Sequence, residues 1–284
     1  MLQSQTRTHP PSVDVKPKLV PVPEIICSVN ESSENIRKNI ESNIKLELPQ
    51  VIPYETQEYK VVALALGGPT LEDTFPDLLQ KHKDGMPVVT VNGTYKYCMD
   101  RGIRPAGFIM LDSRDFNHRF IHETHPECKY FICSQCHPYV FHKLKDNKVW
   151  IWHCAGQDEY KSLLEGQYGD EFYPIMGGST VALRAIHLLR MLGFPKFEVY
   201  GFDSCTIGNH HAYEQKENDK EQHIDVVVGD KEFKCTAANY HQAKEFVQMI
   251  AGTGEYYDLA VHGDGLISYI IKNPNTLKTK DQKI

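Results

Sequence analysis

Residues 61–70 read VVALALGGPT, an apolar run of strand length that ends in two glycines and a proline. A continuous apolar run is typical of a parallel strand covered on both faces, because neither side of such a strand meets water. The glycines and the proline interrupt the strand, and Thr70 with Asp73 provides the start signal of a helix. The stretch therefore predicts a strand, a tight turn and a helix in immediate succession.

Further strands are expected along the rest of the chain, with helical patterns between them. They cover residues 87–91, 108–111, 129–133, 149–153, 197–200 and 259–261. Strands that alternate with helices predict a parallel sheet with helices on both faces. A polar region at 204–236 breaks this rhythm, and the apolar runs on either side of Gly229-Asp230 predict a β-hairpin there. We therefore expect an α/β, Rossmann-like fold with a hairpin excursion.

The segment before this core differs from it in composition. It holds the prolines of an extended arm and then a polar helix near residues 32–44, whose apolar stripe is Ile36, Ile40 and Ile44. A stripe this narrow can pack against one surface, so the helix should lie on the main domain or on a second subunit of a homo-oligomer. The predicted organisation is an arm with a helical appendage (1–57), an α/β domain (58–273) and a lysine-rich tail (274–284).

Composition narrows the classes of protein to consider. The chain has 31 basic and 37 acidic residues, a formal net charge of −6, which gives no support for general nucleic-acid binding. No run approaches the roughly 18 apolar residues of a membrane helix, and the polar N-terminus lacks the apolar core of a secretory signal. The eight cysteines are interpreted as reduced thiols, because a chain of this length does not need disulfides. We therefore predict a cytoplasmic protein.

Polar residues and glycines gather where the expected strands end. In open α/β sheets the carboxyl ends of parallel strands meet at one edge, and ligands bind there. That edge would carry Gly67, Gly68, Asn92, Gly93, Asp112, Ser134, Asp203 and His262. This convergence, more than any single motif, indicates a binding site.

Two glycine-rich turns are candidates for binding a nucleotide's phosphates. The first is Gly67-Gly68-Pro69-Thr70 and the second is Gly177-Gly178-Ser179-Thr180. Each precedes a helix, whose first backbone N–H groups have no partners within the helix and attract anions. Neither has the spacing of a P-loop or of the common dinucleotide-binding motif. An ordinary tight turn or a helix cap is the alternative explanation for each.

Acidic residues and histidines supply the candidate catalytic groups. Asp112 and Asp203 are suited to coordinate Mg²⁺ between phosphates, because hard cations prefer carboxylate oxygens. His211 in the polar excursion and His262 at a strand end are candidates for the base that deprotonates an acceptor. Ordinary loop or cap aspartates, and histidines that are solvated or bonded to their own turn, are the alternatives.

Taken in order, these motifs resemble the 6-hydroxymethylpterin diphosphokinase (MptE-like) family. The likeness covers roughly residues 50–270 and rests on GGPTL at 67–71, VNG at 91–93, MLDSR at 110–114, GGSTV at 177–181, GFDSC at 201–205 and HHAY at 210–213. The resemblance implies a Rossmann-like fold and the ATP- and Mg²⁺-dependent transfer of diphosphate to a pterin hydroxymethyl group.

The strand-end layout also resembles bacterial sialyltransferases that use a CMP-sugar. By that resemblance the nucleotide contacts would be Gly68, Asn92, Ser179 and Thr180. Three functions stay open: a diphosphokinase-like enzyme, a glycosyltransferase with a nucleotide-sugar donor, and a nucleotide-binding protein without catalytic activity. Both enzymatic readings predict a nucleotide donor and a small-molecule acceptor as partners.

Overall fold

The computed structural model describes residues 31–54, 60–121, 123–208, 211–213, 223–252, 258–273 and 277–279. The predicted proline-containing arm and His210 of the HHAY motif lie outside these residues. Within the described ranges, no helix has both the length and the apolar character that crossing a membrane requires.

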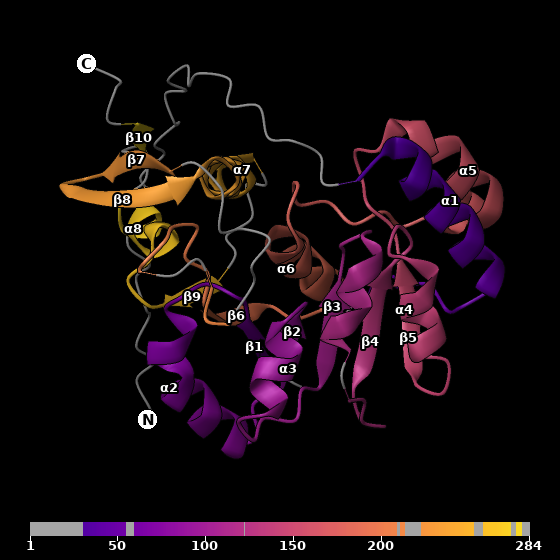
Figure 1. The fold of residues 1–284 in the computed structure, drawn as a ribbon, viewed down its shortest axis with the longest axis horizontal. Helices are drawn as coiled ribbons and strands as arrows, with labels where there is room; N and C mark the ends of the chain where they lie inside the picture. Colours follow the sequence, from indigo (N-terminus) through magenta and orange to yellow (C-terminus); the bar gives the residue numbers. More distant parts are fainter. Residues whose placement is uncertain are drawn as a thin grey trace, which may run out of the picture.

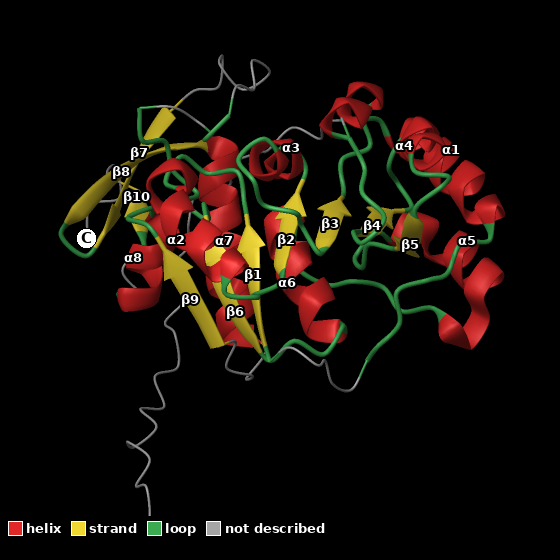
Figure 2. Cartoon of the chain, turned by 90° about the horizontal axis from the view of Figure 1, so that it is seen from below, coloured by secondary structure: helices red, strands yellow, loops and turns green. Residues whose placement is uncertain are grey.

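A seven-stranded parallel sheet forms the centre of the molecule (Figure 1). Its strands are β1 (Val61–Ala65), β2 (Val88–Val91), β3 (Gly107–Met110), β4 (Lys129–Cys133), β5 (Lys148–Trp152), β6 (Lys196–Tyr200) and β9 (Asp258–His262). They lie in the order β5-β4-β3-β2-β1-β6-β9, and every neighbouring pair is parallel. The carboxyl ends therefore meet at one edge of the sheet, as the arrowheads in Figure 2 show. The predicted Rossmann-like α/β fold is confirmed.

The strand order reverses between β1 and β6. From β1 the chain builds the sheet outward through β2, β3, β4 and β5, and it then returns to add β6 and β9 on the other side of β1. At such a reversal the connections that leave the two central strands diverge, and a crevice opens at their carboxyl ends. The topology therefore sets the expected ligand site beside β1 and β6.

Helices cover both faces of the sheet (Figure 1). One face carries α2 (Leu71–Lys83) and α3 (Thr94–Met99), and the other carries α6 (Val181–Met191) and α7 (Ala237–Gly252). Ala63 and Ala65 of β1 pack with Leu71 of α2. Val62 and Leu64 belong instead to the larger core that includes α6. Because alternate residues of a strand point to opposite faces, a strand buried on both sides needs an uninterrupted apolar run.

The polar excursion forms a second, smaller sheet. Strands β7 (His223–Val228) and β8 (Lys231–Thr236) pair antiparallel, and Gly229 in their turn has φ = +63°. The predicted hairpin is therefore confirmed. Strand β10 (Lys278–Thr279) adds to β7, so part of the predicted tail belongs to the folded body. Helix α8 (Leu266–Lys272) follows β9.

The N-terminal helix α1 (Ser33–Asn43) and the 3₁₀ turn η1 (Ile44–Leu46) pack on the main body. Ile36, Ile40 and Ile44 form a small core with Tyr160 and Leu164 of α5 (Asp158–Tyr168). The predicted apolar stripe therefore packs on the main domain, the first of the two expected placements. Elements that the sequence did not predict are α4 (Pro138–Lys143), α5, η2 (Asp115–Phe120) and η3 (Gly169–Glu171).

Candidate active site

A pocket with a volume of about 160 Å³ opens at the carboxyl ends of β1 and β6. This is the point at which the strand order reverses, where open α/β sheets bind their ligands. The predicted site residues that line it are Gly67, Gly68, Asn92, Thr180, Asp203 and His211. The pocket therefore brings together parts of both glycine-rich turns and one of the two candidate histidines.

The first glycine turn lies too close to its neighbours to accept side chains. Gly68 donates its N–H to the carbonyl of Gly201 after β6 (2.9 Å), and a Cβ at Gly68 would collide with that carbonyl. A Cβ at Gly67 would lie 2.8 Å from the hydroxyl oxygen of Tyr213. The backbone contact therefore requires glycine at position 68, whereas a side chain at position 67 would displace Tyr213; both glycines line the pocket.

Asp203, which follows β6, holds the first glycine turn in place through hydrogen bonds. Its carboxylate accepts hydrogen bonds from the backbone N–H (2.8 Å) and the hydroxyl (2.6 Å) of Thr70. The residue is 2% exposed, and this burial raises the pKa of its carboxyl to about 6, although the bonds from Thr70 act in the opposite direction. In this arrangement Asp203 acts as a positioning group for the turn.

Asn92 lies on the opposite side of β1 from Asp203, after β2. Its backbone has φ = +44°, in the left-handed region that asparagine tolerates better than most residues. Its side-chain Oδ1 is buried and has no hydrogen-bond partner among the described residues. Because an unpaired buried oxygen is costly, a ligand O–H or N–H in the pocket would be stabilised there.

A short segment of the excursion crosses over the first turn. Ala212 donates its N–H to the carbonyl of Gly67 (3.1 Å), and Nδ1 of His211 lies 3.1 Å from the same oxygen. The rings of His211 and Tyr213 stack with their centroids 5.6 Å apart, and Tyr213 packs against Gly67 and Gly93. One predicted base therefore lines the pocket, and a tyrosine forms part of its wall.

The second glycine turn is capped by α7. The carboxylate of Glu245 accepts hydrogen bonds from the N–H (3.0 Å) and the hydroxyl (2.7 Å) of Ser179. The same carboxylate lies against Gly178, where a Cβ would meet it at 2.8 Å. Gln242 donates to the hydroxyl of Thr180 (2.7 Å). The carboxylate of Glu245 thus occupies part of the turn where the sequence predicted a phosphate. Thr180, the last residue of this turn, lines the pocket.

Other predicted nucleotide contacts adjoin the pocket without lining it. They are Pro69, Thr70, Gly93, Gly177, Gly178 and Ser179. Each lies within a turn that contributes a neighbouring residue to the wall, so the turns are placed as expected. A nucleotide would meet these six residues only if it extended beyond the pocket.

Asp112 lies apart from these residues, at the end of β3. Its oxygens accept hydrogen bonds from Nε (3.0 Å) and Nη2 (2.6 Å) of Arg114, and it does not line the pocket. The described ranges contain no group of three or more His, Cys, Asp or Glu suited to hold a metal ion. Asp203 lines the pocket and Asp112 does not, so the coordination of Mg²⁺ by this pair stays a prediction.

Helix α1 covers the part of the edge where Ser134 lies. Nδ2 of Asn43 donates to the carbonyls of Ser134 (2.8 Å) and Cys136 (2.7 Å). Asn39, one turn earlier, bonds to loop carbonyls after β3 and β4 in the same way. Ser134 is 1% exposed, so the structure places it beneath α1 and outside the pocket.

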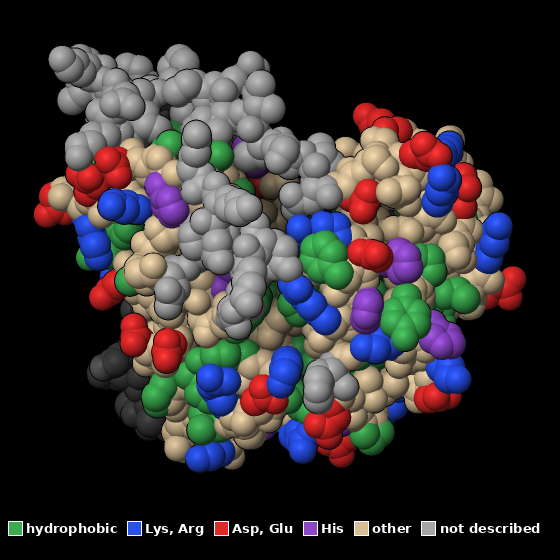
Figure 3. Space-filling view, viewed as in Figure 1, with side chains coloured by type: hydrophobic (Ala, Val, Ile, Leu, Met, Phe, Trp, Pro, Cys, Tyr) green, Lys and Arg blue, Asp and Glu red, His purple; other side chains and the backbone are tan. Residues whose placement is uncertain are grey.

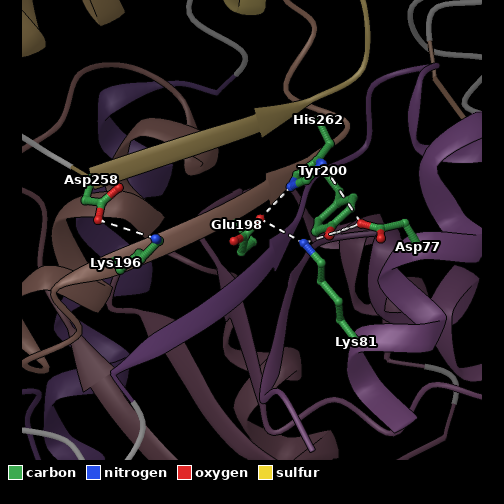
Figure 4. A network of polar contacts seen from close by, with 7 residues as sticks. All are labelled: Asp77, Lys81, Lys196, Glu198, Tyr200, Asp258 and His262. Carbon is green, nitrogen blue, oxygen red and sulfur yellow. Dashed lines mark hydrogen bonds and ion pairs between the residues drawn. The ribbon is translucent and has the colours of Figure 1, made fainter. Parts of the chain in front are cut away.

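His262 belongs to a polar network beside α2, which Figure 4 shows. Its Nε2 lies 2.6 Å from the carboxylate of Glu198, and its ring stacks on Tyr200 with centroids 4.3 Å apart. Tyr200 donates its hydroxyl to Asp77 (2.6 Å), and Lys81 donates to Glu198 (2.9 Å). The structure therefore separates His262 from the pocket that holds His211.

Sequence reasoning missed the contribution of α7. Asn239 and Gln242 line the pocket, and Glu245 caps the second glycine turn. These residues recur every three positions, so they share one face of the helix. The spacing could have been recognised in the sequence. The position of this helix face relative to the sheet could not, because it depends on tertiary packing.

Fold and pocket together define a class of protein: Rossmann-like α/β proteins with a ligand pocket at the reversal of the sheet. The family follows from comparison with known sequences. The chain belongs to the MptE-like family, because the family model described as "6-hydroxymethylpterin diphosphokinase MptE-like" matches residues 34–209, more than half of its length. Membership places the chain among transferases. A search of curated proteins found no match.

The fold of this chain is similar to that of solved protein structures. The MAf glycosyltransferase from Magnetospirillum magneticum AMB-1 matches with a TM-score of 0.60 and 13% identity, over 84% of this chain and 41% of that chain. The chain thus spans less than half the length of that protein. A mammalian sialyltransferase matches with a TM-score of 0.42 and 11% identity, over 82% of this chain and 80% of that one. At such identities the likeness to the glycosyltransferase concerns the fold alone.

Proposed function

We propose that the chain transfers a group from a nucleotide donor bound at the β1/β6 pocket to a small-molecule acceptor. The observation that carries this proposal is that Gly67, Gly68, Thr180 and His211 line one pocket. The start of α6, where Val181 and Ala182 line the pocket, supplies backbone N–H groups for an anion, and the histidine supplies a base beside them. At about 160 Å³, the pocket is smaller than the roughly 300–1,000 Å³ of most ligand sites. It therefore suits the phosphate end of a nucleotide, with the base and the ribose lying outside it.

His211 is the proposed general base. A carbonyl oxygen only accepts hydrogen bonds, so the contact with Gly67 favours a proton on Nδ1 of His211. Nε2 takes the proton of the acceptor hydroxyl, whose oxygen forms a bond to the transferred group. The bond between that group and the nucleotide breaks, and its electron pair stays on the phosphate oxygen of the departing nucleotide.

Two donors fit this scheme. The family description favours ATP, with diphosphate transferred to a hydroxymethyl group such as that of a pterin; Mg²⁺ is part of this candidate. The second candidate is a nucleotide sugar such as CMP-sialic acid, and the likeness to a glycosyltransferase over 84% of the chain favours it. In both cases the bond that breaks joins the transferred group to a phosphate oxygen.

Calorimetric titration of the full chain with ATP, CMP, CDP and UDP, each with and without Mg²⁺, tests the proposal. Saturable binding of ATP that needs Mg²⁺ supports the first donor, and metal-independent binding of CMP supports the second. If none of the four binds, the proposed function is wrong.

A variant pair then tests the base. His211→Asn should lower turnover of the bound donor by about 10²–10⁴-fold, the usual contribution of a general base, and leave the dissociation constant within a few-fold. The matched control is His142→Gln, on the exposed end of α4 away from the pocket. Equal turnover in wild type and His211→Asn would remove His211 from the mechanism.

A further inference from the structure

Helix α7 contacts both hydroxyl residues of the second glycine turn, and the two contacts have opposite chemistry. Glu245 accepts hydrogen bonds from the N–H and the hydroxyl of Ser179, so the hydroxyl proton of Ser179 is used within the protein. Gln242, one turn earlier on the same face of α7, donates from Nε2 to the hydroxyl oxygen of Thr180 at 2.7 Å. A hydroxyl has one proton and two acceptor lone pairs, so this bond leaves the proton of Thr180 available to another acceptor.

The amide of Gln242 is itself held in one orientation. The hydroxyl of Ser204, which follows β6, donates to Oε1 of Gln242 at 2.7 Å. Because Oε1 faces Ser204, the Nε2 side of the amide faces Thr180. Ser204 is 6% exposed, and Ser204, Gln242 and Thr180 all line the β1/β6 pocket. A relay of two hydrogen bonds therefore runs from the end of β6 to the start of α6 along the pocket wall.

Thr180 does not act as an ordinary helix cap. It is the N-cap residue of α6, where a threonine side chain usually accepts a hydrogen bond from an N–H group of the first turn, yet its side chain makes no capping bond. Its hydroxyl is bonded to Gln242 instead. Val181 and Ala182 at the helix start therefore receive no bond from this side chain, and both line the pocket together with Thr180.

We propose that Gln242 is a positioning residue that makes the Thr180 hydroxyl a hydrogen-bond donor to a phosphate oxygen of the nucleotide. The inference rests on the proposed function, since it concerns how the β1/β6 pocket binds its donor. Thr180 adds this bond to those of the N–H groups of α6, whereas the Ser179 hydroxyl adds none while it is bonded to Glu245. A hydrogen bond to a charged phosphate is stronger than one between neutral groups.

A local donor of this kind matters because the surface of the protein is mixed in charge. Figure 3 shows basic and acidic side chains interspersed over one face of the molecule. Such a surface does not by itself select a phosphate. Selection therefore depends on the hydrogen-bond donors inside the pocket, and the relay through Gln242 sets the direction of one of them.

A double-variant cycle tests this role. The tightest-binding of ATP, CMP, CDP and UDP is titrated into the full chain and its variants and followed by calorimetry. Thr180→Val should weaken its binding about tenfold and Gln242→Met about fivefold, in line with the net contribution of one hydrogen bond. The double variant should bind as Thr180→Val does, because the amide acts only through the hydroxyl and the two losses are therefore not additive.

Two further variants separate positioning from a general structural role. Thr180→Ser keeps the hydroxyl and should bind the nucleotide within about twofold of wild type. Gln248→Met, at an exposed position of the same helix, is the matched control and should bind it as wild type does. Circular dichroism and melting temperature confirm that each variant is folded.

The proposal is overturned if Gln242→Met binds the nucleotide as wild type does, or if Thr180→Ser loses as much binding as Thr180→Val. It is also overturned if the double variant binds clearly more weakly than Thr180→Val, since Gln242 would then act independently of the hydroxyl. In each of these cases binding by the wild type leaves the donor site in place. If none of the four nucleotides binds the wild type, the proposed function itself has failed.

Discussion

Replacing Asp203 with asparagine should change how the stability of the protein depends on pH. Burial raises the pKa of this carboxyl to about 6 from an ordinary value of 3.8. Between these values the folded protein binds more protons at this site than the unfolded chain does. The free energy of unfolding must therefore fall as pH rises through this window, and the ionised carboxylate remains a cost above it.

The size of the effect follows from the two pKa values. A difference of about two corresponds to about 3 kcal/mol, because each pKa unit is worth about 1.4 kcal/mol. Asp203→Asn cannot titrate, so it removes this contribution. The difference in unfolding free energy between wild type and Asp203→Asn should therefore change by about 2.5 kcal/mol between pH 4 and pH 7.5, most of the full value, with wild type relatively less stable at the higher pH. Any constant effect of altering the bonds to Thr70 cancels in this comparison.

Urea unfolding followed by far-UV circular dichroism at several pH values measures this difference. Asp146→Asn is the matched control, because this exposed aspartate lies in the loop before β5 and shares no contact with the pocket. Its difference from wild type should stay flat over the same range. A flat difference for Asp203→Asn as well would refute the reasoning that a buried, charged carboxylate holds the glycine turn.

Three further outcomes are expected. Glu245→Gln removes the negative charge that is hydrogen-bonded to Ser179. If this carboxylate competes with a nucleotide's phosphate, calorimetry should show that nucleotides bind the variant several-fold more tightly. Unchanged or weaker binding would show that it does not compete. Asn43→Ala leaves two buried loop carbonyls without a donor, which should cost about 2–4 kcal/mol in urea unfolding, and a loss below about 0.5 kcal/mol would contradict this role of α1. Tyr200→Phe removes the hydrogen bond that most lowers the pKa of Asp77. Stability that depends on that lowered pKa is present at neutral pH and lost on acidification, so the variant should lose less stability than wild type below pH 4, and an identical acid profile would count against it.

The strands and the long amphipathic helices could be predicted because their signals are local. The apolar run from Val61 predicts a strand buried on both faces, and the turn at Gly229 predicts the hairpin. Helix α5 was not predicted because only Tyr160 and Leu164 mark its buried side, and those two residues are buried by α1, which is distant in sequence. The pairing of β10 with β7 likewise depends on a long-range contact.

The candidate site could be predicted in outline because parallel strands bring their carboxyl ends to one edge. That rule placed Gly68, Asn92 and Asp203 correctly at the pocket. It could not say which strand ends stay open, since that depends on what covers them. Asn43 of α1 closes the edge at Ser134, and the pairing of Asp112 with Arg114 depends on side-chain geometry.

A crystal structure of the full chain with its tightest-binding nucleotide tests the central claim most directly. The account predicts that a phosphate lies in the pocket beside Gly67-Gly68, within hydrogen-bonding distance of the backbone N–H groups at the start of α6, with His211 on the same side. A nucleotide bound elsewhere, with Glu245 still on Ser179 and the β1/β6 pocket closed by packed side chains, would contradict it.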